Sequence, residues 1–285
     1  MYELHAVKYG ELNARKRSDL FVGGDSHDGR IDMDYFVWAA IGDDRVCVID
    51  TGFGPDVAAE RGRRYIQSPA ESLSILGVDA ERVEDVVITH MHYDHAGNAA
   101  LFPRARFHVQ DAEMAWCTGR AMTQRHLAAP FEVEDVTTFV RRVFDGRVVF
   151  HAGDSELCAG VSLHHLPGHT PGLQAVRVDT ARGPVVLASD VAHFWANLER
   201  AIPFPIVADV GAYLDSHRRL RALAPSLDHI IPGHDPLVLA RFPAEPGTSD
   251  VVRLDLGPVH TNGATALAPP KPPGKARGVK FGDSK

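Results

Sequence analysis

Three histidines and one aspartate fall within six residues, in the order His90-Met91-His92-Tyr93-Asp94-His95. The apolar stretch 86–89 before them is typical of a buried strand. Histidines at i and i+2 leaving a strand point to the same side, so His90 and His92 can grip one ion. Asp94 and His95 follow where Gly97 permits a sharp turn and can face a second position. Because imidazole and carboxylate are ligands of zinc, iron and manganese, the chain must fold so that a strand ends at a metal site.

Three more polar residues stand where an apolar run ends and a turn begins. His169 lies in Leu-Pro-Gly-His-Thr-Pro-Gly at 166–172, Asp190 closes Val-Val-Leu-Ala-Ser-Asp at 185–190, and His234 lies in Ile-Ile-Pro-Gly-His-Asp at 230–235. A rigid strand can aim a functional group from such a position. Each residue taken singly is more often an ordinary turn residue. Beside the run at 90–95, the three together are candidate ligands of the same site.

The rest of the chain alternates patterns typical of strands and of helices. Expected strands are 36–41, 45–50, 86–89, 106–109, 147–151, 161–166, 173–178, 184–189 and 229–231. Expected helices are 69–76, 98–102, 132–144 and 210–224, with Ser68 and Asp209 as caps. This order indicates sheets covered by helices on their outer faces. We expect one catalytic domain at residues 1–242 and, where the pattern decays, a Pro-rich C-terminal extension at 243–285.

The order His-x-His-x-Asp-His, Gly-His-Thr-x-Gly, Ser-Asp and Pro-Gly-His resembles the metallo-β-lactamase superfamily. Residues 48–52, Val-Ile-Asp-Thr-Gly, also resemble that family's early strand-end aspartate, and the resemblance spans residues 36–236. It implies an α+β fold of the αββα type, a sandwich of two mixed sheets with helices on both outer faces. It also implies two metal ions. The implied ligands are His90, His92 and His169 for one ion and Asp94, His95 and His234 for the other.

The same resemblance implies that Asp190 bridges the two ions and that Asp50 steadies the site from behind the ligands. Five neutral imidazoles and two carboxylates around two dications leave a positive site. A hydroxide is its natural occupant, because metal binding lowers the pKa of water to about 7. Such a hydroxide is a nucleophile, and Asp94 is a candidate to move a proton to the leaving group. We therefore expect a hydrolase with two divalent ions, zinc first, with iron, manganese and cobalt as alternatives.

Chain size and motif spacing are similar to those of the N-acyl-homoserine-lactonase-like group of this superfamily. That similarity implies opening of a lactone or related ester, and hence quorum quenching. These lactonases commonly carry a tyrosine three residues after the bridging aspartate, where it stabilises the ring oxygen as the ring opens. This chain has His193 at that position. His193 is either a hydrogen-bond donor in the same catalytic role or an exposed loop histidine.

Aromatic residues near the expected loops are candidates for substrate contact, because small-molecule pockets favour such groups. They are Phe21, Tyr35, Phe36, Trp116, Phe194 and Trp195. Packing in the core is the alternative for each of them.

Other reactions remain open at this point. Thioester hydrolysis of the glyoxalase II kind ranks lower, because the Pro-rich tail stands where a helical glutathione-binding region would be expected. Amide or aromatic-halide hydrolysis would use the same hydroxide. A non-catalytic metal-binding scaffold would have no chemical reason to keep all seven ligand positions filled.

Composition narrows the partners and the compartment. A net charge of −7 without a dense basic block argues against a nucleic-acid partner. No apolar stretch approaches the length of about 18 residues that crosses a membrane, and the N-terminus lacks a signal-peptide pattern. The three cysteines are scattered without a C-x-x-C pair, which favours a reducing cytoplasm. We expect a cytoplasmic protein with a small-molecule substrate, and a homodimer is an open alternative to a monomer.

Overall fold

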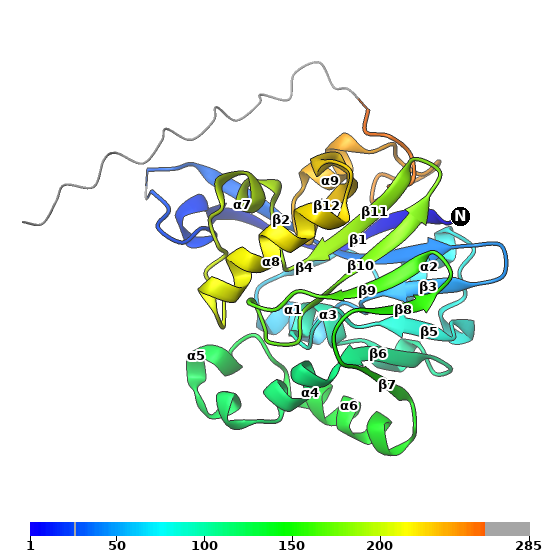
Figure 1. The fold of residues 1–285 in the computed structure, drawn as a ribbon, viewed down its shortest axis with the longest axis horizontal. Helices are drawn as coiled ribbons and strands as arrows, with labels where there is room; N and C mark the ends of the chain where they lie inside the picture. The colour runs from blue at the N-terminus through cyan, green and yellow to red at the C-terminus, as the bar shows by residue number, and fades with distance from the viewer. Residues whose placement is uncertain (26, 260–285) are drawn as a thin grey trace, which may run out of the picture.

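Two β-sheets form the centre of the molecule, and helices cover their outer faces (Figure 1). The computed structural model describes residues 1–25 and 27–259. The strands are β1 (Glu3–Lys16), β2 (Arg30–Ile41), β3 (Val46–Ile49), β4 (Arg64–Tyr65), β5 (Asp85–Val87), β6 (Arg106–Gln110), β7 (Val148–His151), β8 (Ser155–Cys158), β9 (Val161–His165), β10 (Gln174–Thr180), β11 (Gly183–Ser189), β12 (Ile230–Pro232) and β13 (Val251–Arg253). The α-helices are α1 (Pro55–Glu60), α2 (Pro69–Ile75), α3 (Tyr93–Ala96), α4 (Asp111–Cys117), α5 (Arg125–Ala128), α6 (Val133–Phe144), α7 (Trp195–Arg200), α8 (Val210–Leu223) and α9 (Leu237–Arg241). Short 3-10 helices are η1 (Arg17–Asp19), η2 (Ala80–Arg82), η3 (Ala99–Leu101), η4 (Arg120–Thr123) and η5 (Leu227–His229).

Both sheets mix parallel and antiparallel pairs. The first has the order β13-β1-β2-β3-β5-β6-β7, with β4 added beside β1, and the second has the order β12-β11-β10-β9-β8. Strands β3, β5, β6 and β7 run parallel to one another, and β11 runs parallel to β12. The predicted αββα sandwich of two mixed sheets is confirmed.

Strand β2 shows how the layers are filled. Its side chains alternate between the two faces of the sheet. Phe36 and Trp38 belong to the apolar cluster between the sheets, together with Val176 of β10. Tyr35 and Val37 belong to the cluster on the helix-covered face of the first sheet. Both faces of this strand are therefore buried, which explains its nearly continuous apolar sequence.

The two outer layers are held by separate apolar clusters. On the first sheet, Phe139 of α6 packs against Phe107 of β6, with ring centroids 5.3 Å apart. On the second sheet, Leu220 of α8 shares a cluster with Val186 of β11. Among the described residues, none of the helices is both long and apolar enough to pass through a lipid bilayer.

Strand β1 is the largest element that the sequence did not predict, and β4, β8 and β13 were also missed. Polar residues interrupt its apolar pattern, yet they are buried because they pair with one another. Lys8 Nζ lies 2.6 Å from Glu11 and 2.8 Å from Asp34 on β2. The expected helix at 98–102 is only the 3-10 turn η3. The predicted caps Ser68 and Asp209 do stand at the first turns of α2 and α8.

The packed part of the chain continues past the expected boundary at residue 242. Strand β13 pairs with β1, and Leu254 after it is fully buried. The start of the predicted extension, 243–259, is thus packed on the domain. Its Pro-rich remainder lies outside the described residues.

Candidate metal centre

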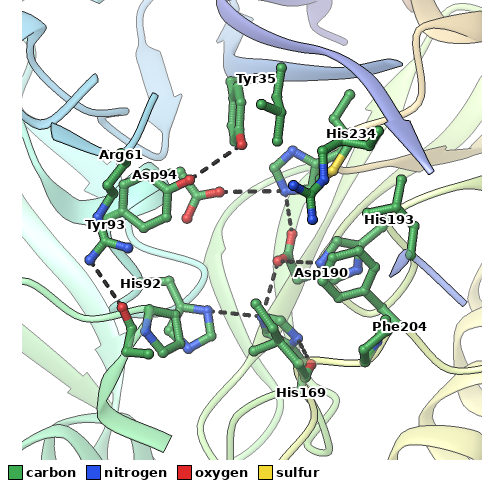
Figure 2. Close-up of a pocket in the computed structure, with 18 of the residues that line it drawn as sticks. Tyr35, Arg61, His92, Tyr93, Asp94, His169, Asp190, His193, Phe204 and His234 are labelled. Carbon is green, nitrogen blue, oxygen red and sulfur yellow. Dashed lines mark hydrogen bonds and ion pairs between the residues drawn. The ribbon is translucent and has the colours of Figure 1, made fainter. Parts of the chain in front are cut away.

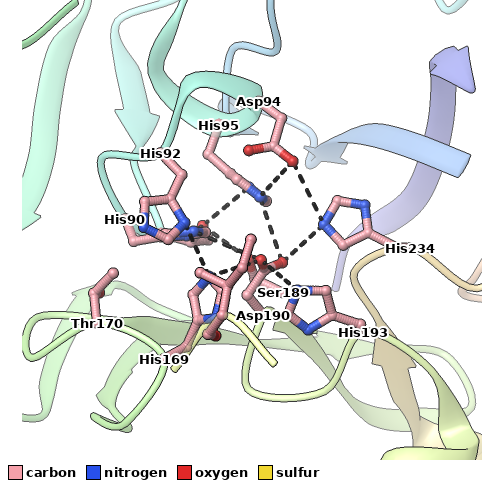
Figure 3. A network of polar contacts seen from close by, with 12 residues as sticks. His90, His92, Asp94, His95, His169, Thr170, Ser189, Asp190, His193 and His234 are labelled. Atoms are coloured by element: carbon pink, nitrogen blue, oxygen red, sulfur yellow. Dashed lines mark hydrogen bonds and ion pairs between the residues drawn. The ribbon is translucent and has the colours of Figure 1, made fainter. Parts of the chain in front are cut away.

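Loops and the short helix α3 at one edge of the sandwich bring all seven predicted ligands together (Figure 3). The run at 90–95 follows β5, and the other three ligands follow β9, β11 and β12. The parallel strands β3 and β5 end at the same edge, as do β11 and β12. Every one of these residues is buried, the most exposed being Asp94 at 8 %.

Asp190 lies between two groups of imidazoles. Its Oδ2 is 3.0 Å from Nε2 of His169 and 3.7 Å from Nε2 of His90. Its Oδ1 is 2.9 Å from Nε2 of His234 and 3.4 Å from Nε2 of His95. Each oxygen of this one carboxylate therefore faces a different group of candidate ligands.

The remaining ligand atoms complete the two groups. Nδ1 of His92 lies 2.9 Å from Nε2 of His169. Oδ2 of Asp94 lies 3.7 Å from His95 and 3.8 Å from His234, in each case from Nε2. Ligand atoms about 2.1 Å from a tetrahedral zinc ion are separated by about 3.4 Å. These spacings fit that geometry.

The outward-facing nitrogens of three histidines have fixed partners. Nδ1 of His169 donates to the carbonyl of Ile206 at 2.6 Å, and Nδ1 of His234 donates to the carbonyl of Asp34 at 2.9 Å. Nδ1 of His95 donates to Asp50 at 2.7 Å. Such bonds leave the Nε2 lone pair of each ring directed at the centre.

Two inward-facing nitrogens show that the centre fits a cation. Nε2 of His90 and Nε2 of His95 are buried and, among the described residues, have no hydrogen-bond partner. A buried polar atom without a partner is costly, and a metal ion would satisfy both.

The electrostatics of the centre also suit a cation. Burial and the neighbouring imidazoles lower the pKa of His90 and of His92 well below its ordinary value. Although burial opposes it, the surrounding histidines hold the pKa of Asp190 well below its usual range. The carboxylates Asp94, Asp190 and Asp50 overcome burial and raise the pKa of His95. The raised pKa favours a proton on Nε2 of His95. Binding of an ion would displace this proton, since a ligand histidine must be neutral.

Asp50 ties the centre to the first sheet. Its carboxylate accepts hydrogen bonds from the amide of Thr89 at 2.7 Å and from the hydroxyl of Thr89 at 2.8 Å. The same hydroxyl lies 2.9 Å from Oγ of Ser189, which precedes Asp190. Asp50 and Ser189 have φ angles of +62° and +46°, values that L residues rarely adopt. This strain is stored where the two sheets meet the centre.

The two glycines around His169 are required by close packing. A Cβ on Gly168 would lie 2.3 Å from Cα of Tyr213 in α8, and a Cβ on Gly172 would lie 2.2 Å from the amide nitrogen of Glu113 in α4. Glu113 is a residue that the sequence analysis missed. A single carboxylate in a stretch without a motif carries no signal of its importance.

A cavity of about 370 Å³ opens beside the centre (Figure 2). His193 lines it and is only 2 % exposed, so it is not an exposed loop histidine. Its Nε2 lies 3.0 Å from Oδ2 of Asp190, and its ring stacks on Phe204 with centroids 3.5 Å apart. Burial lowers the pKa of His193 to about 3, so the ring is neutral.

Of the aromatic residues expected at the substrate, Tyr35 lines this cavity. Trp116 lines only a small adjoining hollow of about 10 Å³. Phe21 and Phe194 instead pack against each other, with ring centroids 5.6 Å apart, and neither lines the cavity.

The prediction that Phe36 and Trp195 contact the substrate is also wrong, because both belong to the apolar cluster between the sheets. The sequence analysis also missed part of the cavity wall. The missed residues are Leu12, Arg15, Asp19, Leu20, Met33, Arg61, Arg63, Tyr93, His126, Ala129, Pro130, Phe204, Pro205 and Ile206. They come from segments far apart in the chain, and none belongs to a recognisable motif apart from Tyr93.

Comparison with known sequences identifies the family. The sequence profile of the metallo-β-lactamase superfamily matches residues 33–234. An N-acyl homoserine lactonase of a Bacillus species is 31 % identical over 133 residues, which are 46 % of this chain and 48 % of that protein. The match thus spans about half the length of this relative. A probable metallo-hydrolase of Mycobacterium tuberculosis is 27 % identical over 239 residues, covering 74 % of each chain.

Solved structures agree with the fold. The crystal structure of a quorum-quenching N-acyl homoserine lactone lactonase superposes with a TM-score of 0.68 at 21 % identity, covering 82 % of this chain and 92 % of that one. The dizinc quorum-quenching lactonase AidC, in complex with a product, superposes with a TM-score of 0.65 at 17 % identity, covering 82 % of this chain and 87 % of that one. The profile match shows that this chain belongs to the metallo-β-lactamase superfamily, and its fold and clustered His and Asp side chains agree with that family.

Proposed function

We propose that this protein uses two divalent metal ions to open a lactone or a related ester, of the N-acyl-homoserine lactone type. The observation that carries the proposal is the position of Asp190. Its two oxygens face separate groups of imidazoles, as a carboxylate that bridges two ions would. The sequence relatives named as lactonases support the choice of substrate.

The proposed ligands are His90, His92 and His169 for one ion and Asp94, His95 and His234 for the other, with Asp190 shared. Zinc suits the histidine-rich donors best, and iron, manganese or cobalt would also be accepted. When bound, the ions would lower the pKa of a water molecule to about 7 and polarise the carbonyl of the substrate.

Two side chains of the cavity are proposed to act on the substrate directly. Asp94 reaches both the centre and the cavity, and its backbone carbonyl is held by the hydroxyl of Tyr9 at 2.7 Å. It is placed to pass a proton to the leaving oxygen. The imidazole of His193 is neutral, and its Nε2 lies beside Asp190. From this position Nε2 can donate a hydrogen bond to the leaving oxygen as the lactone ring opens.

The cavity supports a small-molecule substrate. Its volume of about 370 Å³ lies within the usual range for ligand pockets, and Leu20, Met33, Phe204 and Ile206 give it apolar wall surface. An acyl chain fits such a wall.

The test has two parts. Purified protein is first analysed for metal, and close to two ions per chain are expected. Proton release is then measured with acyl-homoserine lactones, S-acyl thioesters, simple aryl esters and phosphodiesters. Fastest turnover of the lactones supports the proposal. Faster turnover of the thioesters would replace it with a glyoxalase II-like reaction, and protein without metal that turns over none of the four would favour a binding scaffold.

A further inference from the structure

Three arginines line the cavity beside the metal centre, and one of them differs from the other two. Arg15 pairs with Asp19 at 3.5 Å, and Arg61 pairs with Glu132 at 2.6 Å. Arg63 has no carboxylate within ion-pair distance among the residues that the structure describes. The cavity wall therefore carries one cation without a counter-charge.

Two of the three guanidinium nitrogens of Arg63 are held in place. Nε donates to the hydroxyl of Tyr93 at 3.0 Å, and Nη1 donates to the carbonyl of Arg61 at 2.6 Å. For Nη2, no acceptor is found in the described part of the chain. The guanidinium is thus oriented by two bonds while its third nitrogen remains available to a ligand.

The surroundings keep this group charged. Burial alone would lower the pKa of Arg63, but the hydroxyls of Tyr35 and Tyr93 and the carboxylate of Asp94 raise it above its ordinary value. Asp94 is also a proposed metal ligand, so a bound ion would take up most of its negative charge. A half-buried cation without a counter-charge is unfavourable, and a carboxylate binds a guanidinium through charge-assisted hydrogen bonds.

We propose that Arg63 binds a carboxylate of the substrate, so that the preferred substrates are lactones or esters that carry a second, acidic group away from the bond that is cleaved. The inference rests on the proposed function and makes the substrate class narrower. A single free guanidinium nitrogen suits one carboxylate, and the other two arginines of the wall already pair with Asp19 and Glu132.

The experiment compares two 4-nitrophenyl monoesters of the same dicarboxylic acid with the metal-loaded protein. In one ester the far end is the free acid, and in the other it is the neutral amide of the same shape. Acids from glutaric to suberic are used so that the far end can reach Arg63. We expect a kcat/KM at least about tenfold higher for one or more acids than for the matching amides. The acids should differ from the amides mainly through a lower KM.

Three variants assign the preference to Arg63. In Arg63→Gln the ratio of kcat/KM between the acid and the matching amide should fall to about one. Arg63→Lys should keep part of the preference, because the charge remains. Arg64→Gln is the matched control, because Arg64 is the next residue, is exposed, and pairs with Glu11 outside the cavity. It should keep the full preference.

Binding is measured separately from turnover. The ethers 6-(4-nitrophenoxy)hexanoate and 6-(4-nitrophenoxy)hexanamide cannot be hydrolysed at the replaced carbonyl, and their Kd values are determined by calorimetry. If the wild type binds the acid more tightly than the amide and Arg63→Gln does not, the inference is supported, whether or not the esters are turned over. Failure to turn over either ester would count against the proposed function alone. The inference would be overturned if the wild type did not prefer the acid over the amide, or if Arg63→Gln preferred the acid as strongly as the wild type. The proposed function would still stand if the esters were hydrolysed.

Discussion

The carboxylate of Glu113 accepts a hydrogen bond of 2.6 Å from the hydroxyl of Thr170, the residue that follows His169. It also accepts bonds from the amide of Gly172 at 3.0 Å and from the amide of Met91 at 2.8 Å. Met91 lies between His90 and His92. One fully buried side chain of α4 therefore holds the first metal-binding run and the His169 loop at a set distance from each other.

Replacing Glu113 with Gln should loosen both loops. The amide of Gln has one acceptor oxygen in place of two, so at least one of the three donors loses its partner. Positioning residues of this kind typically contribute about 10- to 100-fold in metal affinity or activity. We expect a loss of that size, measured as metal retained after dialysis and as kcat/KM. Asp111→Asn, an exposed change on the same helix, is the control, and equal results for the two variants would show that Glu113 does not position the ligands.

Asp50→Asn should weaken metal binding through His95. The Asp50 carboxylate accepts the proton on Nδ1 of His95 at 2.7 Å, which leaves Nε2 free to bind. An amide nitrogen at that place would favour the other tautomer, with the proton on Nε2. We expect a metal affinity about 10- to 100-fold lower, measured by competition with a chromophoric chelator. Asp56→Asn on the exposed side of α1 should leave the affinity unchanged, and no effect in Asp50→Asn would refute the supporting role of this carboxylate.

His193→Phe tests the donor proposed for the leaving oxygen. Phenylalanine keeps the stacking on Phe204 but cannot donate a hydrogen bond. Removing one such donor typically lowers kcat about 100- to 1000-fold. We expect a fall in lactone turnover of that order while metal content stays near that of the wild type. Unchanged turnover at full metal content would eliminate the role of His193.

Asp135 on α6 should make stability depend on pH. Burial, with Glu132 nearby, raises the pKa of Asp135 from 3.8 to about 7, and Oδ2 has no hydrogen-bond partner within residues 1–25 and 27–259. Because its pKa is higher in the folded state, the folded protein binds more protons between these values, and stability falls as pH rises from 4 to 7. The contribution of Asp135 to stability is fully present below about pH 4 and is lost completely above about pH 7.

Asp135→Asn should remove this dependence. We expect the variant to gain about 1–2 kcal/mol over the wild type between pH 4 and pH 8, less than the pKa change alone would give because the group is partly solvated. Urea unfolding at both pH values measures the difference. The neighbouring exposed Glu134→Gln should track the wild type, and a constant difference between Asp135→Asn and wild type would contradict the raised pKa.

The candidate ligands could be named from sequence because each stands at the end of an apolar strand. Strand and turn patterns are local, so they remain visible along the chain at 86–95 and at 185–190. The packing of the two sheets could be inferred through the family resemblance, and the structure agrees with it. Strand β1 escaped because Lys8 and Glu11 interrupt its pattern, and only their ion pairs with partners elsewhere in the fold make that strand compatible with burial.

The amino-acid sequence alone was sufficient to predict the chemistry of the metal ligands, because the side chains of His and Asp determine which kinds of ion they can bind. The wall of the cavity depended on the three-dimensional arrangement. The sequence suggests Phe194 and Trp195 as substrate contacts, yet both pack in apolar clusters. Arg63, Met33 and Phe204 are instead brought to the cavity from distant segments. The reason is physical: a local pattern encodes where a strand ends, but which side chains face a shared space depends on contacts between residues far apart in sequence.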